Sequence, residues 1–105
     1  MTLRYQVLGT VLIVAAIVGF VAPGALPFVT PRLVHHAAHL SAGVCAIGAA
    51  RRGVGAMRAV GKVLGLGFVV LAVAGFVTEN SALAWMHVGV AVVFFYHALL
   101  APPTL

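Results

Sequence analysis

Four apolar stretches, each approaching the width of a membrane, constrain this chain more than any other feature. They cover residues 7–21, 31–50, 63–77 and 82–100. A helix needs about 20 apolar residues to cross the hydrocarbon core of a bilayer. The second and fourth stretches reach that length, and the first and third reach it with the help of flanking residues. We therefore predict an all-α protein with four transmembrane helices.

Composition agrees with this class and disfavours others. Hydrophobic residues make up 64% of the 105 residues and charged residues only 7%, whereas soluble proteins carry about a quarter charged residues. The first stretch follows a positive head, as in a signal peptide, but a similar segment recurs later, which favours a membrane span. The sequence has no basic stripe interleaved with aromatic residues, so we expect no nucleic-acid partner. A chain this short predicts a single domain, residues 1–105, in the lipid bilayer.

The basic residues predict the orientation of that domain. Arg4 precedes the first stretch, and the segment between the second and third stretches contains Arg51, Arg52, Arg58 and Lys62. Positively charged segments of membrane proteins lie predominantly in the cytoplasm. We therefore predict a bacterial inner-membrane protein with both termini and the central segment on the cytoplasmic side.

The sequence also contains an internal repeat. Residues 7–21 align without a gap on residues 63–77, and about half of the positions are identical. Small residues recur at matching positions: Gly9, Ala16 and Gly19 in the first stretch, and Gly65, Ala72 and Gly75 in the third. Such residues at helical spacing mark faces where helices pack closely. We predict two tandem helical hairpins, residues 5–52 and 60–101, related by an axis along the membrane normal, which makes a parallel repeat.

Histidines are the most unusual polar residues of the apolar stretches. His35, His36 and His39 share one turn of the second stretch, and His87 lies in the fourth. Polar side chains at membrane depth are costly, so they usually have a partner or a function. In the repeat His39 is equivalent to His87, which predicts a similar depth near the outer surface. His36 shares the face of His39, whereas we expect His35 to lie apart, at the level of the lipid head groups.

Two short motifs support a family resemblance. They are His36-x-x-His39-Leu40-x-x-Gly43 and Trp85-Met86-His87. With them, the chain resembles a family of small bacterial, often actinobacterial, four-helix integral membrane proteins of unknown function. The resemblance covers most of the chain, although Ala91 stands where the family pattern has glycine. It implies the four-helix fold and carries no activity with it.

The histidines leave several interpretations open. Neutral imidazole is the commonest protein ligand for zinc, copper and haem iron. His36, His39 and His87 form a candidate copper or zinc site, and His39 with His87 could clamp a b-type haem between helices. The remaining interpretation is structural, because a buried histidine can also hydrogen-bond across helices.

The chain shows no feature of an enzyme. It has no nucleophile paired with a histidine and a buried carboxylate, so we predict a non-enzymatic protein. Its short loops and apolar surface favour an accessory or assembly subunit of a larger membrane complex, with other membrane subunits or further copies of itself as partners. The alternative is a haem- or metal-binding module, and a small transporter ranks last because polar residues are scarce.

Overall fold

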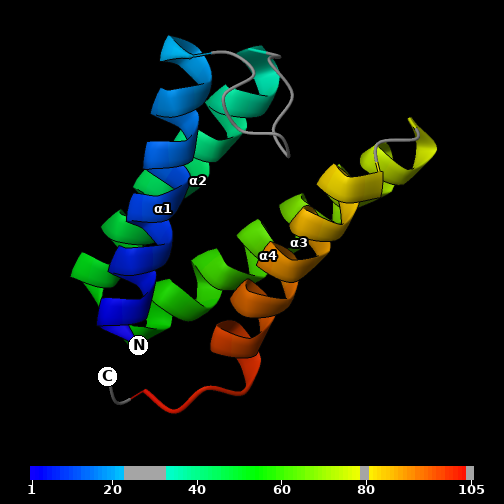
Figure 1. Ribbon diagram of the computed structural model, residues 1–105. Helices are drawn as coiled ribbons and strands as arrows, with labels where there is room; N and C mark the ends of the chain where they lie inside the picture. The colour runs from blue at the N-terminus through cyan, green and yellow to red at the C-terminus, as the bar shows by residue number, and fades with distance from the viewer. Residues whose placement is uncertain (23–32, 79–80, 104–105) are drawn as a thin grey trace.

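The computed structural model describes residues 1–22, 33–78 and 81–103. In this part of the chain it shows four α-helices (Figure 1): α1 (Thr2–Val21), α2 (Leu33–Arg52), α3 (Val54–Val77) and α4 (Ser81–Leu99). The prediction of an all-α protein with four helices is confirmed for these residues. The predicted start of the second helix at residue 31 lies outside them.

α3 begins earlier than the apolar stretch from which it was predicted. Its first turns, from Val54 onward, carry basic residues that resemble a loop by hydropathy but are good helix formers. Gly53 alone therefore makes the turn between α2 and α3, with a φ of 108° that glycine adopts without strain. The Gly53 amide still donates to the carbonyl of Ala49 at 3.2 Å, and the amide of Met57 donates to the Gly53 carbonyl at 3.0 Å.

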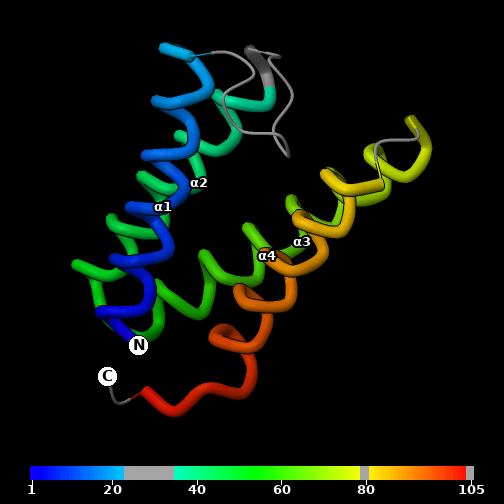
Figure 2. The backbone as a smooth tube through the Cα atoms, in the orientation of Figure 1, coloured from blue at the N-terminus to red at the C-terminus, as the bar shows by residue number. Residues whose placement is uncertain are grey.

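The helices pair as two hairpins. α1 packs along α2 and α3 packs along α4, while α2 also contacts α3. Figure 2 shows that the hairpins lie closest at the end that holds the N-terminus and the turn between α2 and α3, and diverge toward the other end. The predicted pairing into hairpins is confirmed.

Small residues let the helices of each hairpin approach closely. A Cβ atom built at Gly9 would lie 2.7 Å from the carbonyl oxygen of Gly43, and one built at Gly43 would lie 2.6 Å from that of Gly9. In the second hairpin a Cβ at Gly65 would lie 2.9 Å from the ring of Phe95. The predicted close-packing faces are therefore confirmed, and Gly65 packs within this chain.

The two hairpins bury equivalent residues when they are aligned according to the internal repeat of the sequence. α1 buries Tyr5, Gly9, Leu12, Ala16 and Gly19, and α3 buries Gly61, Gly65, Phe68, Ala72 and Gly75. The alignment of His39 with His87 extends in both directions, and it pairs His35 with Leu83 and His36 with Ala84, all of them buried. The two hairpins thus bury equivalent positions but fill some of them with different chemistry.

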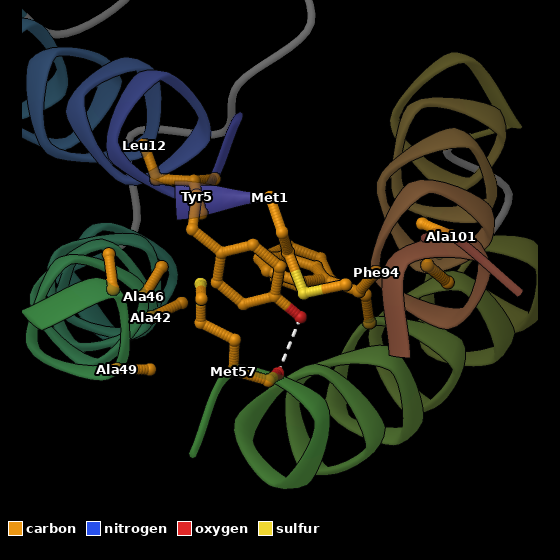
Figure 3. Close-up of a cluster of buried hydrophobic side chains, with 12 residues drawn as sticks. Met1, Tyr5, Leu12, Ala42, Ala46, Ala49, Met57, Phe94 and Ala101 are labelled. Atoms are coloured by element: carbon orange, nitrogen blue, oxygen red, sulfur yellow. Dashed lines mark hydrogen bonds between the residues drawn. The ribbon is translucent and has the colours of Figure 1, made fainter. Parts of the chain in front are cut away.

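A small apolar core joins the hairpins where they meet (Figure 3). The ring of Tyr5 lies between them, 6.1 Å from the ring of Phe94, and its hydroxyl donates to the backbone carbonyl of Met57 at 2.5 Å. Nearby, the Arg58 guanidinium donates to the carbonyls of Ala98 at 3.1 Å and Ala101 at 2.9 Å. Arg58 thereby satisfies one carbonyl in the last turn of α4 and one just beyond its end, neither of which has a partner within the helix.

The outer surface of the hairpins is apolar. Side chains such as Val11, Val63 and Leu99 are more than half exposed. Among the described residues, α1, α3 and α4 are long and apolar enough to cross a membrane. α2 is the most polar helix because it carries three histidines and ends in Arg51 and Arg52. These features indicate a membrane location.

Candidate metal centre

Three imidazoles from two helices gather between the hairpins. His35 and His39 lie one turn apart on the same face of α2, because residues four apart in a helix are neighbours. His87 comes from α4. The ring of Phe68 on α3 lies 6.0 Å from that of His39 and 5.6 Å from that of His87. α3 therefore packs against the cluster through Phe68, while α2 and α4 supply its nitrogens.

The three rings are in mutual contact. Ring centroids are 4.2 Å apart for His35 and His39, 5.1 Å for His35 and His87, and 5.7 Å for His39 and His87. One nitrogen from each ring lies within 4.8 Å of the chosen nitrogens of the other two. The side chains are only 7%, 2% and 1% exposed, respectively. We refer to His35, His39 and His87 as the histidine triad.

Five of the six ring nitrogens of the triad are buried without a hydrogen-bond partner in the described part of the chain. Both ring nitrogens of His39 and of His87, and Nε2 of His35, are buried without a partner among the described residues. The backbone carbonyl of Leu71 interacts with the His87 ring, but no pair of atoms meets the distance and angle of a hydrogen bond. A buried polar atom without a partner destabilises a fold by about 1–3 kcal/mol. Five such atoms in one place therefore indicate a ligand.

A transition-metal ion is the ligand that suits this arrangement. Metal–nitrogen bonds of about 2.0–2.1 Å require the three ligand atoms to lie roughly 3.3–3.6 Å apart. The present upper limit of 4.8 Å is close enough for rotations of the side chains to complete the site. Three imidazole nitrogens suit zinc, copper, iron or nickel and leave further coordination positions open.

The structure brings together two of the three histidines that the sequence singled out. His39 and His87 lie in the triad, whereas His36 faces α1. A Cβ atom at Gly19 would overlap the His36 ring, and the ring of Phe20 lies 5.3 Å from it. The absence of a side chain at Gly19 thus makes the space that His36 fills.

His35, which we expected to lie apart, is the third member of the triad. Its four-residue spacing from His39 was visible in the sequence. However, only the roll of α2 about its axis decides whether His35 or His36 faces α4. Packing of His36 against Gly19 and Phe20 fixes that roll, and the sequence alone does not reveal this contact.

His97 and Cys45 lie outside the site. Nδ1 of His97 is 2.8 Å from the carbonyl of Val93, and its Nε2 is 3.5 Å from Nη1 of Arg4. This geometry assigns the proton to Nδ1, which donates to the carbonyl and leaves Nε2 to accept from the guanidinium. Cys45 is exposed, so it offers no thiolate to the triad.

Comparison of the chain with protein-family models, with curated proteins and with solved structures finds no match. The resemblance to a bacterial four-helix membrane family therefore stays a prediction. The histidine triad is what a functional interpretation can rest on.

Proposed function

We propose that this protein is a non-enzymatic integral membrane protein that binds one transition-metal ion through His35, His39 and His87. The observation that carries the proposal is the convergence of three buried imidazoles whose ligand atoms lie within 4.8 Å of one another. A purely structural role would pair these nitrogens with backbone or side-chain groups. Five of these six nitrogens have no such partner among the described residues, and a metal ion would satisfy one nitrogen of each ring.

The membrane topology that we propose has four spans. α2 has the same length as α1, 20 residues, and packs along it, so both cross the same depth of bilayer. The hairpins would then form a parallel repeat with both termini and the turn at Gly53 in the cytoplasm, as the positive-inside rule favours. Arg51 and Arg52 end α2, whereas the triad lies near its beginning. The metal site would therefore lie toward the outer surface.

A single ion suits the site better than a b-type haem. His39 and His87 could act as axial ligands of a haem, but His35 touches both of their rings and Phe68 packs on both. A porphyrin is several times wider than an imidazole and would require the space around the metal that these two side chains occupy.

A subunit role in a larger membrane complex, which the sequence favours, is compatible with metal binding. The exposed apolar side chains of the hairpins are equally suited to lipid and to other membrane helices. The triad offers more specific support, and we therefore place metal binding first and keep the subunit role as a prediction.

Metal analysis of the detergent-purified protein tests the proposal. The chain carries an affinity tag without histidine, is loaded with Zn²⁺, Co²⁺ or, anaerobically, Cu(I), and is freed of excess ions by gel filtration. We expect one ion per chain and a coordination shell with three nitrogen ligands and no sulfur in X-ray absorption spectra. His39→Ala should lose the ion, and His97→Ala, a matched change of a buried histidine outside the triad, should keep it. Retention of the ion by His39→Ala, or a metal-free wild type, would overturn the proposal.

A further inference from the structure

The charge of the histidine triad and of its surroundings narrows the choice of ion. Neutral imidazoles are the ligands, so the site adds no negative charge to a bound cation. The described residues include no aspartate or glutamate, because the one acidic residue of the sequence, Glu79, lies outside them. A bound ion would therefore keep its full charge unless it brings an anion from solution.

The site is also shielded from water. The three imidazoles are buried, and the ring of Phe68 covers His39 and His87. The cost of moving an ion into surroundings of low dielectric constant grows with the square of its charge. A divalent ion with neutral ligands consequently costs about four times as much to bury as a monovalent ion of the same size.

The number of ligands also favours a monovalent ion. The triad supplies three nitrogens, and His36, the next imidazole along α2, is turned toward Gly19 and Phe20. Zinc sites complete a tetrahedron with a fourth ligand, and Cu(II) prefers a square or tetragonal arrangement. Cu(I) has a lower charge than these ions, binds fewer ligands, and is stable with three.

We propose that the histidine triad selects Cu(I) over Zn(II) and Cu(II), an inference that rests on the proposed function. Cu(I) binds as a monovalent ion to the three neutral imidazoles, and no change of its oxidation state is needed. The repeat shows which part of the chain provides this selectivity. The positions of His35 and His36 are filled by Leu83 and Ala84 in the second hairpin, so one extra imidazole on α2 converts a pair of equivalent histidines into a three-coordinate site.

Anaerobic competition measures this selectivity directly. The detergent-purified protein is titrated into the coloured Cu(I) complex of bicinchoninate, and Zn(II) binding is measured against a zinc-sensitive dye. We expect the protein to withdraw one Cu(I) per chain and to bind Cu(I) at least about 100-fold more tightly than Zn(II). X-ray absorption should show a Cu(I) edge with three nitrogen neighbours, including when the protein is loaded with Cu(II) in the presence of ascorbate.

Two variants separate the role of His35 from that of His36. His35→Leu places on α2 the residue that the second hairpin tolerates at the equivalent position, so it should fold while losing the preference for Cu(I). His36→Gln keeps a side chain of similar length against Gly19 and Phe20, and with it the roll of α2, but removes the imidazole, so it should bind Cu(I) as the wild type does. Circular dichroism and gel filtration establish that both variants are folded and monodisperse.

The outcomes separate the two proposals. Equal or tighter binding of Zn(II) or Cu(II) at the triad would overturn the selectivity for Cu(I) and leave metal binding intact. Absence of binding for all these ions would overturn both. Loss of Cu(I) in His36→Gln with retention in His35→Leu would overturn the assignment of the third ligand.

Discussion

The two hairpins have the same packing pattern and different chemistry. In each hairpin, a glycine on the first helix packs directly against a side chain of the second helix. A Cβ atom at Gly9 would clash with Ile47, and a Cβ atom at Gly65 would clash with Phe95, which is the equivalent residue. The pattern differs at two buried sites near the start of the second helix. There α2 has His35 and His36, whereas α4 has Leu83 and Ala84.

This difference distinguishes the residues that helix packing requires from those that the metal site requires. Leucine and alanine serve the second hairpin at these two positions, so helix packing does not require a polar side chain there. Histidine at the same positions in the first hairpin introduces ring nitrogens without partners, at a cost in stability that packing does not offset. A bound ligand explains His35, whose ring joins the histidine triad, whereas His36 packs against Gly19 and Phe20.

The largest effect, on metal affinity, is expected when one of the two equivalent histidines, His39 and His87, is removed. His39→Ala removes one of the two histidines that the repeat relates, and with it a metal ligand. Loss of outer partners of a metal site weakens binding by about 10–100-fold, so loss of a ligand should exceed about 100-fold. In the wild type, an ion at 100 times its dissociation constant should stabilise the fold by about 2.7 kcal/mol, visible as a rise in Tm. An equal rise in the Tm of His39→Ala would contradict the proposed metal site.

The next effect concerns the closest helix approach. Gly9→Ala puts a methyl group 2.7 Å from the carbonyl oxygen of Gly43, and because that atom belongs to the backbone the helices must separate. Overpacking of this kind costs about 1–3 kcal/mol. In the second hairpin, Gly65→Ala meets the ring of Phe95, which can turn aside for about 0.5–1.5 kcal/mol. Thermal unfolding in detergent measures both changes.

A matched control accompanies these two variants. Gly67 lies in α3 with no atom within 4 Å of a built Cβ. Gly67→Ala should therefore leave stability unchanged or raise it by up to about 1 kcal/mol, because alanine favours the helix. A loss in Gly65→Ala that equals or exceeds the loss in Gly9→Ala would show that the α3–α4 crossing is the more rigid of the two.

A smaller effect should follow when the second hairpin is made to resemble the first. Leu83→His adds a fourth imidazole at the position equivalent to His35. Four nitrogens suit the tetrahedral preference of zinc, so we expect Zn²⁺ to bind about 10-fold more tightly and the preference for Cu(I) to narrow. Leu83→Asn, which adds polarity without an imidazole, is the control. Unchanged zinc affinity in Leu83→His would mean that the hairpins are not equivalent around the site.

The fold could be predicted further than the site, for a physical reason. Hydropathy and the recurrence of Gly9 as Gly65 predict helices and their packing faces, because these depend on local sequence. The start of α3 at Val54 was missed because charge marks a segment as a loop even when its residues favour a helix. His39 and His87 were found through the repeat.

The third ligand required tertiary information. His35 and His36 are neighbours in the sequence, and about 100° of helix rotation separates their directions. Contact of His36 with Gly19 on α1 decides which of them faces α4. That contact joins two helices across a connection of the chain, and no local pattern in the sequence records it.

The smallest effect on stability is expected at the joint between the hairpins, the small core around Tyr5. The two hairpins also differ in the residue that they place there. Tyr5 of α1 donates a hydrogen bond to the carbonyl of Met57, while its equivalent in α3 is Gly61, over which the Tyr5 hydroxyl lies. Tyr5→Phe keeps the ring and removes this bond, so the free energy of unfolding should fall by about 0.5–1.5 kcal/mol. Tyr96→Phe on the exposed side of α4 should change nothing.

Metal affinity in Tyr5→Phe then tests whether the joint controls the site. The bond ties the first hairpin to the first turn of α3, at the end where the hairpins converge, and the triad spans α2 and α4. If the packing of Phe68 alone holds the triad together, Tyr5→Phe should bind the ion within about twofold of the wild type, since distant and independent sites act additively. A weaker affinity would instead show that the angle between the hairpins, set at Tyr5, determines how closely His87 approaches His35 and His39.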